Sequence, residues 1–226
     1  MAFSAVYFDC DSTLSEIEGI DELARKAAPA VRSRIESLTA DAMDGRVPLE
    51  RVYAERLEIV RPSRAALDEV GRTYVERVVP GVREVVEVLA RLGKHVGIVS
   101  GGLEPAVLCL ARALGIPPSN VHAVPLFFDD EGRYAGFDAD SPLARAGGKI
   151  EVLDRISSEH GPLCFVGDGI TDLEAQNVVE AFVGYGGVVR RDAVADGART
   201  YLEEKDLRAL LDIVLTPEER RATRGV

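Results

Sequence analysis

The chain contains no apolar stretch that approaches the ~20 residues needed to cross a lipid bilayer. Residues 1–8 contain neither the basic region nor the long apolar region of a secretory signal. Cysteine is scarce, and Cys10, Cys109 and Cys164 lie too far apart for a disulfide framework or a zinc-binding spacing. These absences predict a cytoplasmic protein with reduced cysteines in its core and no membrane partner.

Positive charge is also scarce. The 226 residues carry a formal net charge of −11. The lysines are Lys26, Lys94, Lys149 and Lys205. A nucleic-acid partner is excluded, because binding to a phosphate backbone needs a concentrated basic surface. Any anionic ligand would need a local positive source, such as a metal ion, a lysine or a helix N-terminus. The position of each lysine is therefore informative.

Three short apolar runs share one pattern. They span residues 5–8, 96–99 and 163–166, and each is followed directly by a polar cluster. Continuous apolar runs of this length suit strands buried on both faces, as in a parallel sheet. Helical patterns at 103–114 and 149–158 alternate with these runs, so the sequence predicts a doubly wound α/β core. Ligands of such cores bind at the C-terminal ends of the strands, where all three clusters fall.

The first run is followed by a long insertion. Residues 14–79 show several helical patterns instead of one crossover helix, and Ser63 is a candidate N-cap for the last of them. We therefore predict an α/β core of residues 1–13 and 80–226, and a small helical cap of residues 14–79 that serves as a lid. A β-hairpin over residues 126–137 is expected to project from the core.

Asp9 and Asp11 stand two residues apart directly after the first apolar run. On a regular strand, side chains at this spacing face the same side. One carboxylate could then attack an electrophile while the other transfers protons. Aspartates next to Ser12 and Thr13 are equally typical of a turn or a helix cap, so this pair by itself leaves both interpretations open.

Two further clusters suit an anion and a hard cation. Asp168 and Asp172 follow the third run, and with Asp9 they offer the oxygen ligands that magnesium prefers, although Gly-Asp-Gly also occurs in ordinary tight turns. Ser100-Gly101-Gly102 is expected to open a helix whose N–H groups could receive a phosphate oxygen, with a simple helix cap as the alternative. Lys149, at the head of another helix, could bind a phosphate oxygen and keep Asp9 ionised.

In this order, four segments resemble the motifs of the haloacid-dehalogenase-like phosphatases. They are Asp9-Cys10-Asp11-Ser12-Thr13-Leu14, Ser100-Gly101-Gly102, Lys149 and Gly167-Asp168-Gly169-Ile170-Thr171-Asp172. Further stretches resemble the phosphoserine phosphatases within that family. These are Glu18–Ala24, Ala42-Met43-Asp44-Gly45 with Leu49 and Arg56, and Gly184–Arg190. The resemblance covers nearly the whole chain, and it departs at Leu49, where a phenylalanine is usual.

The resemblance implies a Mg²⁺-dependent phosphomonoester hydrolase that works through an aspartyl-phosphate. Asp9 would be the nucleophile and a metal ligand. Asp11 would give a proton to the leaving group and take one from water, and its backbone carbonyl would bind the metal. Asp168 would complete the metal site, supported by Asp172. The phosphate oxygens would be held by Ser100, Gly101, Gly102, Lys149 and Thr171.

The cap is expected to select the substrate, because the core touches only the phosphoryl end. Free phosphoserine carries an ammonium and a carboxylate, and Glu18 and Arg56 are the acid and the base at the family's positions. An arginine can hold a carboxylate through two parallel hydrogen bonds. Met43 and Leu49 would line an apolar wall. The predicted reaction is hydrolysis of O-phosphoserine to serine and phosphate, the last step of serine biosynthesis, by a monomer or a homodimer.

Two alternatives remain open at this point. The same chemistry could act on another small phosphorylated metabolite, or could pass the phosphoryl group from Asp9 to another hydroxyl. A sensor without turnover could also bind metal and phosphate through the same residues. Removing the charge of Asp9 separates an enzyme from a sensor, and removing Arg56 separates phosphoserine from other substrates.

Overall fold

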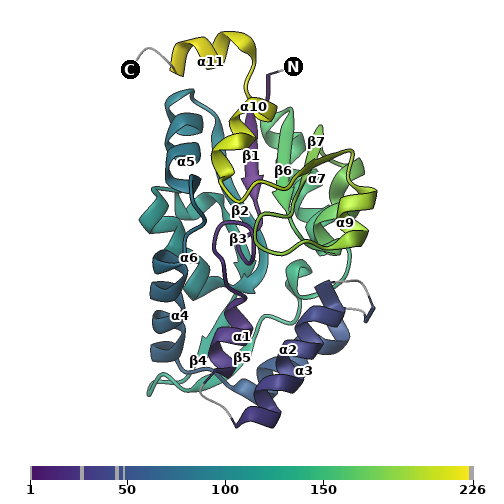
Figure 1. Cartoon of the computed structure of the whole chain (residues 1–226). Coiled ribbons are helices and arrows are strands. Elements are labelled where there is room, and N and C mark those ends of the chain that lie inside the picture. The colour runs from purple at the N-terminus through teal and green to yellow at the C-terminus, as the bar shows by residue number, and fades with distance from the viewer. Residues whose placement is uncertain (1, 26–27, 44–45, 48, 224–226) are drawn as a thin grey trace.

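Six parallel strands form one sheet, in the order β3-β2-β1-β6-β7-β8 (Figure 1). The computed structural model describes residues 2–25, 28–43, 46–47 and 49–223, without the side chains of residues 42, 43 and 49–51. The strands of the sheet are β1 (Ala5–Phe8), β2 (His95–Leu103), β3 (Val121–Val124), β6 (Leu163–Gly167), β7 (Ala181–Tyr185) and β8 (Thr200–Leu202). The predicted doubly wound α/β core is confirmed, with β1 beside the point where the strand order reverses.

The alternation of side chains along β1 divides the core in two. Val6 and Phe8 belong to a buried cluster with α5, α6 and α10, whereas Ala5 and Tyr7 belong to a second cluster with α7. Both faces of the sheet are therefore covered. The helices on or beside the sheet are α5 (Val82–Arg91), α6 (Glu104–Leu114), α7 (Gly148–His160), α8 (Ile170–Leu173), α9 (Asp192–Gly197), α10 (Leu211–Val214) and α11 (Pro217–Thr223). Short 3₁₀ turns are η1 (Pro118–Asn120), η2 (Pro142–Ala144), η3 (Glu174–Asn177) and η4 (Leu207–Leu210). No helix within the described ranges is long and apolar enough to span a membrane.

The long insertion after β1 consists of helices. They are α1 (Gly19–Ala24), α2 (Pro29–Met43), α3 (Leu49–Val60) and α4 (Arg64–Glu76). Ser63 caps α4, as predicted, because its Oγ accepts the N–H of Ala66 at 3.2 Å. Helix α4 packs along α6, where a Cβ on Gly71 would come within 2.6 Å of Cys109 Cβ. The division into a core and a cap of residues 14–79 stays a prediction.

A two-stranded hairpin leaves the C-terminal edge of the sheet. Strands β4 (Leu126–Phe128) and β5 (Tyr134–Phe137) pair antiparallel, which confirms the predicted hairpin. Figure 1 shows this hairpin below the sheet, on the same side as α1, α2 and α3. The insertion and the hairpin therefore lie at the end of the sheet where parallel strands place ligands.

The structure corrects one expected helix start. Strand β2 continues through Ser100, Gly101 and Gly102 to Leu103, and α6 begins only at Glu104. The strand continues because Leu103 pairs with Val124 of β3 after an irregularity in the register. The segment Ser100–Gly102 is therefore an irregular strand end instead of the first turn of a helix.

A substitution at Gly97 tests how tightly the sheet is packed. A Cβ at this position would lie 2.1 Å from Tyr7 Cε1 and 2.5 Å from the carbonyl oxygen of Asn120. Gly97→Ala is therefore expected to lower the free energy of unfolding by about 1–3 kcal/mol, because a packed core accommodates an added methyl group only by shifting its neighbours. Urea unfolding measures the change. Glu87→Ala, on the exposed face of α5, should stay within about 0.5 kcal/mol of wild type, and an equally stable Gly97→Ala would contradict the packing described here.

Candidate active site

The chain turns sharply where β1 ends. The carbonyl oxygen of Cys10 accepts the N–H groups of Thr13, Leu14 and Ser15, and Ser12 adopts a left-handed conformation with φ 51°. Cys10 is fully buried in the core, with the aspartates on either side of it lining the cavity. The predicted role of Cys10 as a small core residue is confirmed, and all three cysteines are free. The tight turn therefore places the carboxylates of both Asp9 and Asp11 at the same cavity.

One cavity gathers most of the predicted site residues. It has a volume of about 50 Å³, which on this measure is room for only a few water-sized groups. Its lining comes from the segments that follow β1 and β6, from β2 and η2, from α1, α3 and α4, and from the heads of α7 and α8. The predicted residues that line it are Asp9, Asp11, Glu18, Arg56, Ser100, Gly101, Gly102, Lys149, Asp168 and Thr171. Segments far apart in the sequence therefore meet at the C-terminal end of the sheet.

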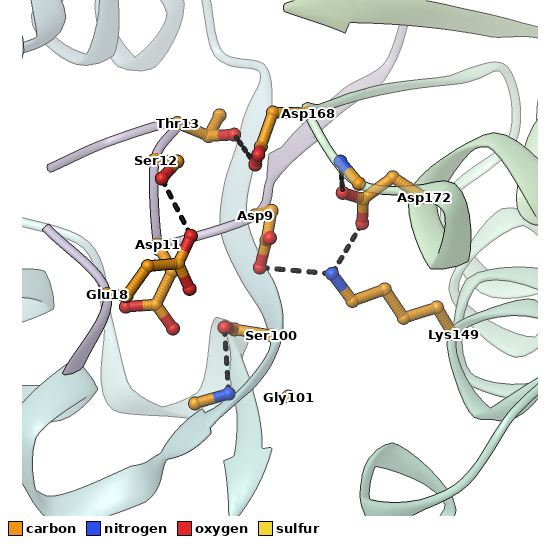
Figure 2. A network of polar contacts seen from close by, with 12 residues as sticks. Asp9, Asp11, Ser12, Thr13, Glu18, Ser100, Gly101, Lys149, Asp168 and Asp172 are labelled. Carbon is orange, nitrogen blue, oxygen red and sulfur yellow. Dashed lines mark hydrogen bonds and ion pairs between the residues drawn. The ribbon is translucent and has the colours of Figure 1, made fainter. Parts of the chain in front are cut away.

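Lys149 stands between two aspartates (Figure 2). Its Nζ lies 3.1 Å from Asp9 Oδ1 and also pairs with Asp172 Oδ1, in a short contact. Burial alone would lower the pKa of Lys149, but the charges of Asp172 and Asp9 outweigh it and raise the pKa above lysine's ordinary value. Asp172 also accepts the N–H of Gly169 at 2.9 Å and is fully buried. Asp172 therefore lies behind Lys149 and orients it toward Asp9.

Asp168 is held from two sides. Its Oδ1 accepts the hydroxyl of Thr13 at 3.1 Å, and its Oδ2 accepts Nε of Arg191 at 3.0 Å. Oxygen atoms of Asp9, Asp168 and Asp172 lie within 4.8 Å of one another, and all three residues are buried. Buried carboxylates this close repel one another unless protons or a cation compensate their charge. A hard divalent cation suits this oxygen-only donor set, so the residues present fit a metal site.

Burial and mutual repulsion raise the pKa values of several carboxyl groups around this site. Burial, followed by the charge of Asp9, raises the pKa of Asp11 to about 7. Burial, followed by the charge of Glu18, raises the pKa of Asp168 to about 7. Burial and then the charge of Asp11 raise that of Glu18 to about 8. A cation bound among the carboxylates would lower these values, because it stabilises their charged forms.

One oxygen of the Asp11 carboxylate accepts two hydrogen bonds. Oδ1 accepts the hydroxyl of Tyr74 at 2.5 Å and the N–H of Gly19 at 2.8 Å. Burial and the charge of Asp11 raise the pKa of Tyr74 well above tyrosine's ordinary value, so the hydroxyl keeps its proton and donates. Asp11 is thereby tied to both α1 and α4.

Glu18 and Arg56 line the same cavity from the insertion. Glu18 Oε1 accepts the hydroxyl of Ser12 at 2.7 Å and lies 3.5 Å from Nη2 of Arg191. Arg56 is 4% exposed, donates from Nη1 to Thr39 Oγ1 at 3.1 Å, and leaves its Nε without a hydrogen-bond partner. A buried guanidinium with a free donor is unfavourable unless an acceptor arrives. An anionic group in the cavity would supply that acceptor.

Some predicted residues are placed differently or lie outside the description. The N–H of Gly102 donates to Ser100 Oγ at 3.0 Å, so this N–H is already used within the strand end. The side chains of Met43, the last residue of α2, and Leu49, the first of α3, lie outside the described residues, and their place at an apolar wall stays a prediction.

Three lining or contacting residues were absent from the sequence prediction. Arg191 enters the site, whereas Arg190, the last residue of the predicted late segment, is half exposed and pairs with Glu203. The sequence alone does not say which of two adjacent arginines points into the site, because the backbone conformation decides the direction of each side chain. Tyr53 lines the cavity and donates to the carbonyl of Gly101 at 2.9 Å. Tyr74 lies 63 positions from Asp11, and only the packing of α4 brings the two together.

Comparison with known proteins agrees with this geometry. A family model described as haloacid dehalogenase-like hydrolase matches residues 3–177. A phosphoserine phosphatase of Bos taurus is 38% identical over 202 residues, which cover 88% of this chain and 89% of that protein. The chain therefore belongs to the haloacid dehalogenase-like hydrolases, and it is a phosphatase. Within that class, the resemblance to phosphoserine phosphatases is confirmed.

Solved structures show the same architecture. A phosphoserine phosphohydrolase-like protein from Francisella tularensis subsp. tularensis SCHU S4 superposes with a TM-score of 0.86 at 24% identity, covering 94% of this chain and 100% of the other. A structure described as a phospho-aspartyl intermediate analogue of phosphoserine phosphatase gives a TM-score of 0.82 at 25% identity, covering 95% and 100%. The arrangement of sheet and inserted helices is thus shared over nearly the full length.

Proposed function

We propose that this phosphatase hydrolyses O-phosphoserine to serine and phosphate through a phosphorylated Asp9, with Mg²⁺ in the acidic cluster. The observation that carries the proposal is the convergence of Asp9, Asp168 and Lys149 on one cavity, with Asp11 two residues beyond Asp9. The names of the relatives support the choice of substrate, because the curated proteins matched at 35–38% identity are phosphoserine phosphatases.

The reaction would use two carboxylates in succession. A carboxylate oxygen of Asp9 attacks the phosphorus atom, and the ester oxygen leaves with a proton from Asp11. Asp11, now ionised, takes a proton from a water molecule that attacks the phosphorus of the aspartyl-phosphate. Phosphate departs and the Asp9 carboxylate is restored. Lys149 and the strand end at Ser100 and Gly101 would bind the phosphoryl oxygens throughout.

Asp9, Asp168 and the backbone carbonyl of Asp11 would hold the Mg²⁺ ion. When bound, the ion would neutralise negative charge on the phosphoryl oxygens and on the buried carboxylates. Asp172 would act through Lys149, which it pairs with on the side away from the cavity. Thr171, which lines the cavity at the start of α8, would add a hydroxyl to the phosphate site.

The amino-acid end of the substrate would be recognised by the insertion. Arg56 has a buried guanidinium with an unpartnered Nε, which suits a carboxylate. Glu18, opposite in charge, suits an ammonium group and is already oriented by Ser12. Both side chains line the cavity that contains Asp9, so the two charges face the space beside the proposed nucleophile.

The decisive experiment is phosphate release from a panel of phosphomonoesters with Mg²⁺. Phosphoserine should be hydrolysed far better than O-phosphoethanolamine, which lacks the carboxylate, and than glycerol phosphate, which lacks both charged groups. A preference for sugar phosphates, or transfer of the group to an added alcohol instead of water, would overturn the proposed substrate or reaction.

Arg56→Ala tests the carboxylate contact directly. Loss of a buried charged pair typically costs roughly 2–5 kcal/mol of recognition, so KM for phosphoserine should rise by about 30-fold or more. The KM for phosphoethanolamine should change little, because that substrate has no carboxylate to lose. Steady-state kinetics on both substrates measure the difference.

The control for this variant is Arg34→Ala. Arg34 is an exposed arginine on α2 whose partner, Glu55, is also outside the cavity. Its loss should leave both KM values unchanged. An equal rise of KM for both substrates in Arg56→Ala would indicate damage to the cap instead of a lost carboxylate contact.

The cytoplasmic location of the protein and its state as a monomer or a homodimer stay predictions.

A further inference from the structure

Tyr74 reaches the active site from a helix that is otherwise part of the packing around α6. It is 1% exposed, and its ring belongs to the same buried cluster as Cys10 and Val70. Its hydroxyl, the one polar atom of the side chain, donates a hydrogen bond of 2.5 Å to Asp11 Oδ1. A tyrosine this deeply buried retains its hydroxyl at a cost unless the hydroxyl is bonded, so the contact explains the choice of residue.

The two oxygens of Asp11 have different surroundings. Oδ1 receives donors from both Tyr74 and Gly19, which occupy its two lone-pair directions. Oδ2 faces the phosphate-binding strand end, since a Cβ on Gly102 would lie 3.2 Å from it. A carboxyl group that accepts two hydrogen bonds at one oxygen must carry its own proton on the other. The geometry therefore distinguishes Oδ2 as the oxygen that faces the reaction.

We propose that Tyr74 is a positioning residue of the phosphatase reaction, which with the N–H of Gly19 fixes Asp11 so that Oδ2 delivers the proton to the leaving group. The inference rests on the proposed function. In the first step the Oδ2–H bond breaks as the phosphorus–oxygen ester bond breaks, and the departing oxygen becomes a hydroxyl. In the second step Oδ2 takes a proton from the attacking water, which restores the neutral carboxyl.

Tyr74→Phe removes the hydroxyl and keeps the ring. General acid–base catalysis contributes typically 10²–10⁴-fold, and misplacing the acid should forfeit part of it. We expect kcat/KM for phosphoserine to fall by about 10–100-fold, through kcat, with KM nearly unchanged. Acetyl phosphate provides the comparison, because its acetate leaves without a proton. Its kcat/KM, which reports steps only as far as phosphorylation of Asp9, should fall by less than about 3-fold.

The ratio of the two kcat/KM values is the test. An equal fall for both substrates, or no fall for either, overturns the role of Tyr74 while leaving hydrolysis of phosphoserine by the wild type intact. If the wild type does not hydrolyse phosphoserine, the proposed substrate fails, and the same ratio is measured with the alkyl phosphate that it does hydrolyse. The two ideas can therefore fail separately.

Tyr185→Phe is the matched control. Tyr185 is fully buried in β7, and its hydroxyl donates to the carbonyl of Lys205 at 2.7 Å, outside the cavity. This variant loses a buried hydroxyl of the same kind and should keep the wild-type ratio. A ratio that shifts as much as in Tyr74→Phe would assign the effect to general loosening and overturn the proposal.

Gly19→Ala tests the same hydrogen bond by a second variant, in which residue 74 remains a tyrosine. A Cβ at position 19 would lie 2.2 Å from the Tyr74 hydroxyl oxygen, so the hydroxyl must move. The selective loss with phosphoserine should reappear in this variant, including the case in which Tyr74→Phe does not fold. A Gly19→Ala protein that keeps the wild-type ratio would overturn the proposal.

Discussion

Asp9→Asn is expected to abolish phosphate release from every substrate. The amide has nearly the same shape as the carboxylate, so the buried position can be filled, but it offers no anionic oxygen to attack phosphorus. Residual turnover should lie below ~10⁻⁴ of wild type, since the nucleophile and the covalent route disappear together. Acid quench of the wild type with substrate, followed by mass spectrometry, should find one phosphoryl group on the peptide that contains Asp9. The Asp9→Asn protein should carry none.

Asp212→Asn is the control for this change. Asp212 lies exposed on α10, pairs with Arg220 and is not part of the cavity lining. It makes the same carboxylate-to-amide exchange and should keep full activity. Turnover that persists in purified Asp9→Asn protein, or a phosphoryl group found on another residue of the wild type, would end the proposed mechanism. Phosphate binding without turnover in the wild type would instead favour a sensor.

Removal of divalent metal is expected to stop the reaction, and Mg²⁺ should restore it. The reason is the crowding of Asp9, Asp168 and Asp172, whose buried oxygens lie within 4.8 Å of one another. Asp168→Asn should raise the Mg²⁺ concentration needed for half-maximal activity by roughly 100-fold or more, because even partners outside the coordination shell typically contribute 10–100-fold. Calorimetric titration of Mg²⁺ into the substrate-free protein measures the same loss without relying on activity.

Asp192→Asn provides the comparison for the metal experiment. Asp192 begins α9 with a largely exposed side chain and pairs only loosely with Arg190, at 3.5 Å. Its Mg²⁺ titration should match that of the wild type. If Asp168→Asn binds Mg²⁺ as tightly as wild type does, the acidic cluster is not the metal site, and the charge of Asp168 is balanced by Arg191 alone.

Local patterns were enough to predict β1, β2 and β6, the hairpin and the order of the polar clusters, but not β3, β7 and β8. The run 5–8 coincides with β1, and 163–166 falls within β6, because a continuous apolar run has few places other than a sheet covered on both faces. The helical pattern predicted at 103–114 agrees with α6, which begins at Glu104. The expectation that Ser100–Gly102 opens this helix was wrong, because the pairing of Leu103 with Val124 extends β2 and no local signal reports a partner strand.

The sequence by itself was enough to predict the family and the phosphatase class, because the two aspartates after the first strand, the lysine and the later aspartates occur in the order of the family's motifs. Tertiary structure decided which other side chains serve them. Tyr74 reaches Asp11 because α4 packs on α6, and Arg191, not its neighbour Arg190, reaches Asp168 because of the path of the chain after β7. Such contacts depend on the direction of side chains across large separations in sequence, and periodicity carries information only about near neighbours along the chain.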